Sequence, residues 1–509
     1  MCSFHPLQIH FQALHRMAVA GMVNNDYEEE LLWAATFTAA NKELIWNPEE
    51  SETDSDTEEE DKDDPSVNPG HRLFISNAVL MPDAKKDDVC IIQVESEGYN
   101  KIKVITPIIA MKGGADYQQY VDILVPTYDE PLAVLQRSLL GCTQQSYPHT
   151  TVWVLDDGSR EEVRQLARRL GCRYQHRPER RHAKAGNLNA GLRRCHGELV
   201  AVFDADFIPQ HRFLERSIGF LLEPDVALLQ TPQSFINADP VMRNLRLESW
   251  LLPDEESFYR WIEPVRDGWG AVVCAGTAFV VRRQALDQVG GFVEAALSED
   301  YVTGIALREQ GWKLLYLQQK LSAGLAAESM ADFVRQRQRW ANGTLQSLRL
   351  PQGPLQARGL SLGRRLAYLE GVVHWLNNLP RLVLMLMPLS YGLLGITPIL
   401  LDQQAIIELM LPLWGTVLLS IGWLNRHSRS ALLTELTSWV LTVPLVVTLI
   451  SHVLGSSMGF RVTPKHRHRS QGGWAWFLAL PLILLSLLNL ANLLGLIQQL
   501  ILISLFLHF

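Results

Sequence analysis

The sequence is poor in cysteine, and its cysteines form no pattern. Its 509 residues include six, which are scattered over the chain as Cys2, Cys90, Cys142, Cys172, Cys195 and Cys274. No two of them have the spacing of zinc ligands or of a redox-active pair. We therefore expect reduced thiols of the cytosolic kind, and neither a zinc site nor a redox dithiol.

Long apolar runs are absent from the first two thirds of the chain. The start has no secretory pattern, because residues 26–30 are acidic where a signal peptide would be hydrophobic. From about Val372 onward, apolar segments appear near 372–394, 406–424, 432–454 and 474–497. Each has about the 20 residues that a bilayer requires. This pattern predicts a membrane-embedded C-terminal third and a polar remainder.

The net charge of −8 is a local feature. Residues 49–64 hold eleven acidic side chains and one basic side chain, Lys62, so the rest of the chain is close to neutral. Such a tract is typical of a solvated, disordered loop, or of a surface for a basic partner. We expect no nucleic acid among the partners.

The middle region alternates between short apolar runs and helix-like segments. The runs at 121–125, 151–155 and 199–203 resemble buried strands, and 161–170 resembles a helix. This alternation predicts an α/β domain with a mostly parallel sheet. The chain then divides into an extension (1–30), a β segment (31–120), the α/β domain (121–350) and apolar helices (351–509).

Acidic side chains follow each of these three strands. Because ligands of open α/β sheets bind beyond the carboxyl ends of the strands, we expect these side chains to meet at one site. Each could alternatively cap a helix that follows. The residues concerned are Glu130 after the first strand, Asp156 and Asp157 after the second, and Asp204 and Asp206 after the third.

Two features in this region suit a diphosphate. Asp204 and Asp206 flank one small residue, so both carboxylates could bind a cation such as Mg²⁺ or Mn²⁺. The cation would neutralise a departing diphosphate. Lys184 lies among alanine and glycine residues that would let a diphosphate approach the backbone. The alternative is an ordinary surface lysine.

Seven short motifs occur in one order along the chain. They are 126–130, Leu155-Asp156-Asp157-Gly158, 182–187, Phe203-Asp204-Ala205-Asp206, Gln230-Thr231-Pro232, Ser298-Glu299-Asp300 and Gln336-Arg337-Gln338-Arg339-Trp340. Together they resemble glycosyltransferase family 2, specifically the bacterial cellulose synthase catalytic subunits, over about 121–497. The resemblance implies a GT-A-like domain.

The resemblance also implies a role for each motif residue. Tyr128, Glu130, Asp156 and Asp157 would bind the uridine of a UDP-sugar, Lys184 its diphosphate, and Asp204 with Asp206 the metal. Asp300, beside Glu299, would be the catalytic base. Gln336, Arg339 and Trp340 match the motif of processive members, in which the indole supports the terminal sugar. Without the resemblance, this last motif could be only a basic helix beside a membrane.

The family pattern bears on the membrane topology as well. Basic loops with Arg426 and Arg429, and with Arg461 and Lys465, flank segment 432–454, and positive loops prefer the cytosol. We therefore expect this segment to lie at the cytosolic interface or to be re-entrant. The resemblance identifies Phe460, Val462, Thr463 and Lys465 as a gating loop over bound nucleotide; a plain linker is the alternative.

Residues 31–114 resemble a different family, the nucleoplasmin-type histone chaperone core. The matching stretches are 71–75, 81–86, 89–94 and 107–114. The resemblance implies a partial β-sandwich that carries the acidic tract as a loop. Two alternatives therefore stay open. The chain could be a chimera of two families, or it could be a protein that binds basic partners and has an inactive synthase part.

The combined reading is a membrane-bound processive enzyme that uses UDP-glucose to extend a β-1,4-glucan. Its expected partners are UDP-glucose, the growing polysaccharide, the lipid bilayer and a periplasmic synthase subunit. We expect a multi-pass protein of the bacterial inner membrane with a cytosolic catalytic domain. Departures from the family pattern at Phe207 and around Cys274 leave another β-linked polymer open: chitin, hyaluronan or β-1,3-glucan.

Overall fold

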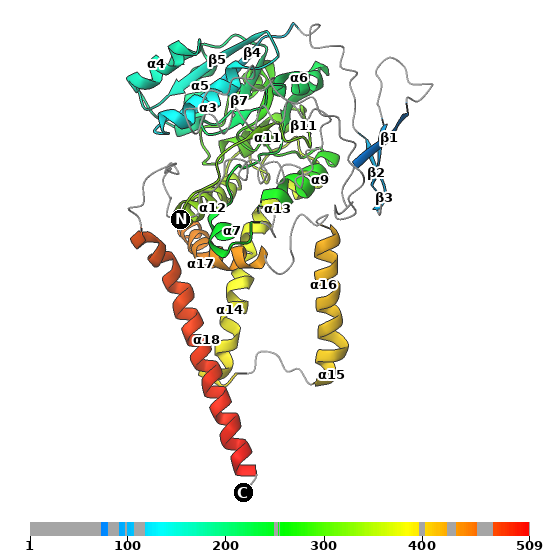
Figure 1. The fold of residues 1–509 in the computed structure, drawn as a ribbon, viewed down its shortest axis with the longest axis vertical. Coiled ribbons are helices and arrows are strands. Elements are labelled where there is room, and N and C mark those ends of the chain that lie inside the picture. Colours follow the sequence, from blue (N-terminus) through cyan, green and yellow to red (C-terminus); the bar gives the residue numbers. More distant parts are fainter. Residues whose placement is uncertain are drawn as a thin grey trace, which may run out of the picture. The chain divides into compact units, whose positions relative to one another are not determined.

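The computed structural model describes most of the chain from residue 118 onward and three strands before it (Figure 1). The described residues are 73–79, 91–96, 99–105, 118–248, 253, 255–396, 403–424, 434–455 and 472–507. The acidic tract 49–64 and the expected gating loop 460–465 lie outside these ranges.

The first described unit contains a small antiparallel sheet. Its strands are β1 (Leu73–Val79), β2 (Ile91–Ser96) and β3 (Tyr99–Ile105), in the order β1-β2-β3. β2 pairs with both neighbours in antiparallel register. This arrangement agrees with the β segment expected within residues 31–120.

The second unit is built on a seven-stranded sheet in the order β11-β9-β10-β7-β4-β5-β6. β10 runs antiparallel to β7 and β9, and the other pairings are parallel. The mostly parallel sheet is therefore confirmed. Its strands are β4 (Val121–Thr127), β5 (Thr150–Asp156), β6 (Arg173–Gln175), β7 (Leu199–Val202), β9 (Val226–Gln230), β10 (Phe279–Arg282) and β11 (Lys313–Tyr316).

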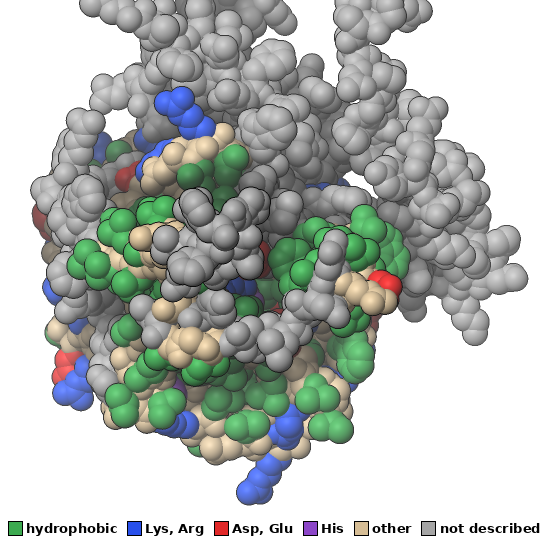
Figure 2. Space-filling model, turned by 90° about the horizontal axis from the view of Figure 1, so that it is seen from below, with side chains coloured by type: hydrophobic (Ala, Val, Ile, Leu, Met, Phe, Trp, Pro, Cys, Tyr) green, Lys and Arg blue, Asp and Glu red, His purple; other side chains and the backbone are tan. Residues whose placement is uncertain are grey.

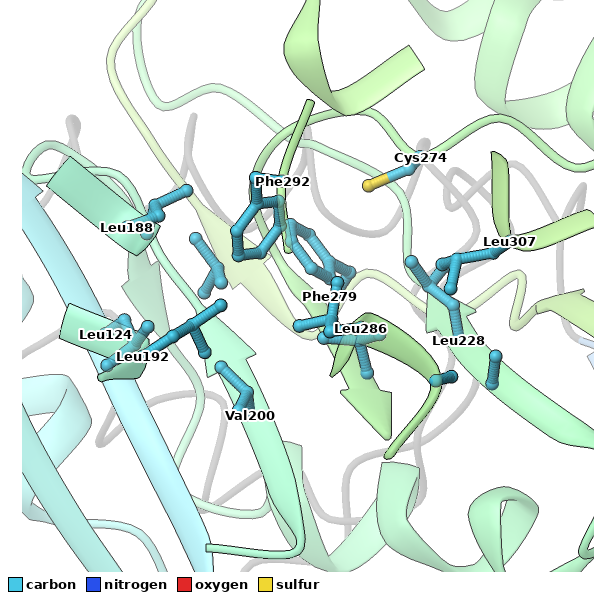
Figure 3. Packing of buried hydrophobic residues seen from close by; sticks show 14 of the residues in the cluster. Leu124, Leu188, Leu192, Val200, Leu228, Cys274, Phe279, Leu286, Phe292 and Leu307 are labelled. Carbon is cyan, nitrogen blue, oxygen red and sulfur yellow. The ribbon is translucent and has the colours of Figure 1, made fainter. Parts of the chain in front are cut away.

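The sheet is central because its strands are apolar on both faces. Every residue of β4 is buried, which a parallel strand covered on both sides requires. In Figure 3, Leu192 of helix α5 lies beside Leu124 and Val200, and Phe279 lies beside Phe292; Leu188 belongs to the same cluster. Full burial of one such side chain contributes about 1.5–3 kcal/mol. This core fixes the strand ends from which the site is built.

Helices and short strands surround the sheet or extend from it. Around it lie α3 (Leu132–Thr143), α4 (Glu161–Arg169), α5 (Ala183–Leu192), β8 (Ile208–Pro209), α7 (Pro240–Leu245), α8 (Glu255–Ser257), η4 (Phe258–Ile262), α9 (Glu263–Gly268), α10 (Arg283–Val289), α11 (Glu299–Glu309) and β12 (Ser322–Ala323). α6 (Phe213–Ser217) and η3 (Ile218–Leu222) follow β8. The later helices are α12 (Met330–Ser347), α13 (Leu362–Leu376), α14 (Asn378–Leu394), α15 (Gln403–Ala405), η5 (Ile406–Met410), α16 (Leu411–Leu424), α17 (Thr434–Val453) and α18 (Gly472–Leu507).

The four described cysteines agree with the sequence prediction. Cys142, Cys172, Cys195 and Cys274 are free thiols, and all four are buried. Burial raises the pKa of Cys172 to about 11 and that of Cys195 to about 12. They are therefore unreactive thiols that pack in the core.

Two described helices are long and apolar enough to cross a bilayer. They are the parts of α17 and α18 at Glu435–Val453 and Ala479–Gln498; the apolar helix Ile406–Ile421 is shorter. This is a finding of length and composition alone.

The expected single segment at 372–394 is wrong in detail. It is divided at Asn377 between α13 and α14. α13 belongs to the α/β domain, since Tyr368 is fully buried and its hydroxyl donates to the carbonyl of Val272. The sequence shows that a helix is apolar, but not whether protein or lipid covers it.

Candidate active site

A cavity of about 970 Å³ opens where the carboxyl ends of β4, β5 and β7 meet. It is lined by residues of these strand ends and of α5, α11 and α12. Of the sequence-predicted site residues that the structure describes, all but Asp156 line it: Tyr128, Glu130, Asp157, Lys184, Asp204, Asp206, Glu299, Asp300, Gln336, Arg339 and Trp340. Side chains separated by more than 200 positions in the sequence therefore share one cavity.

Asp156 faces the turn after β5 instead of the cavity. Its carboxylate accepts hydrogen bonds from the backbone N–H groups of Gly158 (2.8 Å) and Arg160 (2.7 Å) and from the Tyr174 hydroxyl (3.0 Å). The Arg160 guanidinium is also within 3.2 Å. Asp156 thus holds the loop that presents Asp157, and direct contact with uridine stays a prediction.

Asp157 is held by Arg177, which was not among the predicted site residues. The Arg177 guanidinium donates to both carboxylate oxygens, at 2.7 and 2.8 Å. The same side chain donates to the carbonyls of Arg181 and Ala183 at 2.6 and 2.8 Å. Through these hydrogen bonds, Arg177 links the end of β5 to Ala183, the first residue of α5 and the neighbour of Lys184.

Glu130 and Tyr128 form the rim at the end of β4. Glu130 accepts from the Thr127 hydroxyl at 2.6 Å and from the Tyr128 N–H at 2.8 Å. Burial raises the pKa of Glu130, and the nearby Asp206 carboxylate adds to this effect. The Tyr128 ring is exposed, with the Arg180 guanidinium 5.8 Å from its centroid. The rim therefore offers an aromatic face beside a carboxylate.

Lys184 joins three parts of the site. Its ammonium donates to Asp204 Oδ1 at 2.5 Å and to the carbonyl of Gly276 at 2.6 Å. Burial alone would lower the pKa of Lys184, but the carboxylates of Asp204 and Glu299 raise it above its ordinary value. The site therefore keeps a permanent positive charge beside Asp204.

Glu299 and Asp300 project from the first turn of α11. Burial raises the pKa of both, and the neighbouring Asp300 helps to raise the pKa of Glu299 to about 7. Lys184 and Arg339 oppose these shifts. Gly276 leaves room for Asp300: its φ is +86°, and a Cβ there would lie 2.4 Å from Asp300 Oδ2. Only glycine fits this position without displacing the carboxylate.

Helix α12 brings Gln336, Arg339 and Trp340 to the cavity wall. The Trp340 indole is supported from behind by Arg337, whose guanidinium lies 4.5 Å from its ring centroid. Arg337 also donates to Glu255 at 2.5 Å, and both side chains are largely buried. Arg337 lies within the motif at 336–340, but neither its supporting role nor Glu255 was predicted from the sequence.

The donor set suits a hard divalent cation. Among the described residues, no group of three or more His, Cys, Asp or Glu side chains could hold a metal. Asp204 and Asp206 offer carboxylates from one turn, and Mg²⁺ or Mn²⁺ usually completes its shell with water and substrate phosphate oxygens. The two residues therefore fit a cation that is held jointly with a diphosphate.

The cavity continues beyond the carboxylates towards the apolar helices. Trp375 of α13, Arg381 of α14 and Glu435 of α17 line this end. Arg381 Nε lies 3.2 Å from Glu435 Oε2, so an ion pair joins α14 to α17. Residues 460–465 lie outside the described part, and their gating role stays a prediction.

Three family models match the chain. Glycosyl transferase family 2 matches residues 122–290, Cellulose synthase matches residues 282–425, and the Nucleoplasmin/nucleophosmin domain matches residues 30–133. The first two matches contain every described residue of the cavity that the sequence predicted. The third agrees with the resemblance of the N-terminal segment.

Individual relatives give the same result. The chain is 34% identical over 354 residues to the cellulose synthase 1 catalytic subunit (UDP-forming) of Komagataeibacter xylinus, covering 68% of this chain and 47% of the relative. It is 34% identical over 388 residues to the corresponding subunit of Pseudomonas fluorescens, covering 75% and 52%. The chain thus spans about half the length of these curated relatives.

Solved structures are similar at a lower level. The mannosyltransferase PcManGT of Pyrobaculum calidifontis, solved with GDP-Man and Mn²⁺, is 19% identical with a TM-score of 0.40, covering 67% of this chain and 89% of that one. S. aureus TarS is 15% identical with a TM-score of 0.37, covering 66% and 54%. The family matches and the sequence relatives show that residues 122–425 of this chain are similar to glycosyltransferase family 2 and to the cellulose synthase catalytic subunits.

Proposed function

We propose that this chain is a processive, inverting glycosyltransferase that moves glucose from UDP-glucose to the end of a growing β-1,4-glucan. The observation that carries the proposal is the cavity in which Asp300 faces the Lys184–Asp204 pair across Gly276, with Trp340 on the wall. A carboxylate, a fixed cation and an aromatic platform are the groups that transfer to a sugar acceptor requires.

The donor would bind at the ends of β4 and β5. Tyr128 would stack on the uracil ring, and Glu130 and Asp157 would bind the uridine by hydrogen bonds. Asp156, Arg160 and Arg177 hold these side chains in place. Lys184 would neutralise part of the diphosphate charge, which favours its departure as UDP. The sugar would then lie between Lys184 and Asp300.

The transfer itself would be a single displacement. The acceptor hydroxyl oxygen attacks the anomeric carbon, the bond from that carbon to the diphosphate oxygen breaks, and Asp300 takes the hydroxyl proton. Attack from the face opposite the leaving group inverts the anomeric centre. A buried carboxylate with a raised pKa is a stronger proton acceptor than an ordinary aspartate. The Asp204 carboxylate adds to this increase, and the charges of Lys184 and Arg339 oppose it.

Asp204 and Asp206 would hold Mg²⁺ or Mn²⁺ together with the diphosphate. When bound, the cation would supply additional positive charge at the departing oxygen. Lys184 already contacts Asp204, so it would keep this carboxylate oriented both with and without the cation.

Processive synthesis requires that the product stay bound after each transfer. Gln336, Arg339 and Trp340 would hold the terminal sugar near Asp300, and Trp375 further along the cavity would contact the preceding part of the polymer. Phe460, Val462, Thr463 and Lys465 would close over the bound nucleotide.

The membrane arrangement is part of the same proposal. α17 packs along α12, where Gln338 donates to the Pro444 carbonyl at 3.1 Å. A helix fixed to the catalytic domain in this way suits the cytosolic interface better than a free span. α14, α16 and α18 would cross the bilayer of a multi-pass inner-membrane protein, with the catalytic domain in the cytosol and a periplasmic synthase subunit on the far side.

Two other functions remain candidates. The same cavity could take another UDP-sugar and make chitin, hyaluronan or β-1,3-glucan. The match of residues 30–133 to the nucleoplasmin domain, with the acidic tract inside it, favours a separate capacity to bind basic proteins. Binding of purified histones by an Asp300→Asn variant would test the second candidate without any sugar transfer.

The central experiment supplies membranes containing this chain with Mg²⁺ and each labelled UDP-sugar in turn. We expect insoluble product from UDP-glucose alone, digestible by a β-1,4-glucanase, and none from Asp300→Asn. A glucanase-resistant product from another donor would identify a different synthase. No product from any donor, with normal membrane insertion, would refute the enzymatic proposal.

A further inference from the structure

We propose that the chain binds the phosphate of an anionic phospholipid between α11 and α13, outside the catalytic cavity. The site consists of Arg308 near the end of α11, Arg364 in the first turn of α13, and the backbone at Gly270. This inference rests on the proposed membrane association but not on the proposed sugar transfer.

The two guanidinium groups converge on one backbone position. Gly270 has a φ of +63°, and a Cβ placed on it would lie 3.1 Å from Arg308 Nη2 and 3.4 Å from Arg364 Nε. Both guanidinium groups are positively charged and lie beside the same backbone position, so they repel each other. Keeping them together costs free energy of folding unless an anion binds between them. A phosphate accepts from two arginines in this geometry.

Arg308 has donor capacity that the protein does not use. Its side chain is 8% exposed, and Nη1 donates to the Trp312 carbonyl at 2.6 Å. Its Nε is buried and has no hydrogen-bond partner among the described residues. Burial lowers the pKa of Arg308, and the charge of Arg364 lowers it further. A buried donor without a partner in a native structure is a sign of an unseen ligand.

Two acidic side chains in this region, Asp225 and Glu309, are engaged elsewhere. Asp225 pairs with the Lys313 ammonium at 2.5 Å. Glu309 accepts from the backbone N–H of Arg358 at 2.7 Å. No ion pair joins either carboxylate to Arg308 or Arg364 within the part of the chain that the structure describes. The positive charge of the pair is therefore available to an external anion.

The surroundings favour a lipid over a free phosphate. Trp269 is 60% exposed, and its ring packs over Gly363, whose Cβ position would be 2.8 Å away. Leu362 and Leu366 of α13, the helix that contains Gly363, are also exposed. Tryptophan and apolar side chains beside arginine are typical of membrane interfaces.

The chain continues from this helix into the apolar α14, which places the site near the proposed membrane surface. Seen from below in Figure 2, the described side chains are largely hydrophobic, with Lys and Arg among them. An acyl chain could lie on the exposed apolar side chains while the phosphate reaches the two arginines.

The test titrates the detergent-solubilised full chain with dihexanoyl phosphatidylglycerol and measures binding by calorimetry. Dihexanoyl phosphatidylcholine and inorganic phosphate are separate arms. The variants are Arg364→Gln, Arg364→Lys and, as a matched loss of charge on exposed α4, Arg169→Gln. Each arginine near a lipid surface contributes about a fivefold change in binding.

We expect Arg364→Gln to weaken phosphatidylglycerol binding about fivefold, while Arg364→Lys and Arg169→Gln bind as the unaltered chain does. Wild-type binding by Arg364→Gln, or equal loss in Arg169→Gln, would overturn the proposal. Inorganic phosphate binding as tightly as the lipid would overturn the choice of a lipid. Because the assay uses detergent and no UDP-sugar, its failure is distinct from failure of membrane insertion or catalysis.

Discussion

At the residue scale, the site depends on one glycine that lets two charged groups approach. The Gly276 carbonyl accepts a hydrogen bond from the Lys184 ammonium. Because Gly276 has no side chain, the Asp300 carboxylate can lie against its Cα. Gly276→Ala would place a methyl group 2.4 Å from Asp300 Oδ2 at a φ that alanine rarely adopts. We expect sugar transfer to fall by about 100-fold, since small displacements of a catalytic group cost that much.

Gly290 provides a control that separates the effect of backbone strain from the effect of the clash with Asp300. Its φ is +82°, but nothing lies within 4 Å of its Cβ position. Gly290→Ala should lower the thermal midpoint through the same positive-φ strain but without a clash, and it should leave kcat unchanged. Equal activity of the two variants would show that Gly276 matters only for folding.

The raised pKa values predict the pH dependence of transfer. As the proposed base, Asp300 must be ionised to accept a proton, so activity should be present above its pKa and should be lost as the pH falls through it. Because burial raises this pKa, the acid limb should lie above the ordinary aspartate value of 3.8.

Arg339→Gln should move the acid limb to higher pH, because it removes a neighbouring positive charge that favours ionisation of Asp300. The measurement is kcat/KM against pH at fixed metal concentration. Glu161→Gln, an exposed change on α4, is the control and should leave the limb in place. An unmoved limb in Arg339→Gln would contradict the assignment of Asp300 as the base.

At the scale of elements, α12 joins the cavity wall to its support. Its Arg337 stacks on Trp340 and pairs with Glu255 of α8. Arg337→Gln and Glu255→Gln should each raise KM for an oligosaccharide acceptor more than they lower kcat, because the indole loses its backing. The double variant should show a coupling energy of about 0.5–3 kcal/mol in unfolding experiments. Additive effects would mean that the pair does not act together.

The elements themselves were largely predictable. The apolar runs at 121–125, 151–155 and 199–203 became β4, β5 and β7 because buried parallel strands need apolar residues on both faces. The acidic residues that follow these strands predicted the position of the cavity. The orientation of Asp156 was not predictable, because a carboxylate at a strand end can face either a ligand site or its own turn, where Gly158 and Arg160 donate to it. The supports Arg177 and Arg337 were not predictable either, since their partners lie 20 and 82 positions away in the sequence. For the same reason the pattern at 372–394 concealed the boundary between α13 and α14.

At the scale of the whole molecule, the cavity links the transfer site to the apolar helices. Its lining includes Asp300 and Trp340, Trp375 of α13, and the Arg381–Glu435 pair. A cavity of about 970 Å³ with this lining would have room for more than one sugar of a polymer. The length of the product should therefore depend on residues that are remote from the chemistry.

Trp375→Ala tests this dependence. The ring lies beside His374, with centroids 4.8 Å apart, and it lines the cavity beyond the catalytic groups. Loss of an aromatic platform should let the polymer dissociate earlier, while the first transfer, which uses only Asp300 and its neighbours, continues at the original rate. We expect shorter glucan at unchanged UDP release, measured by product sizing and a coupled UDP assay. Trp423→Ala, an exposed change on α16, should alter neither quantity. Equal product lengths for both tryptophan variants would mean that the polymer leaves by another route.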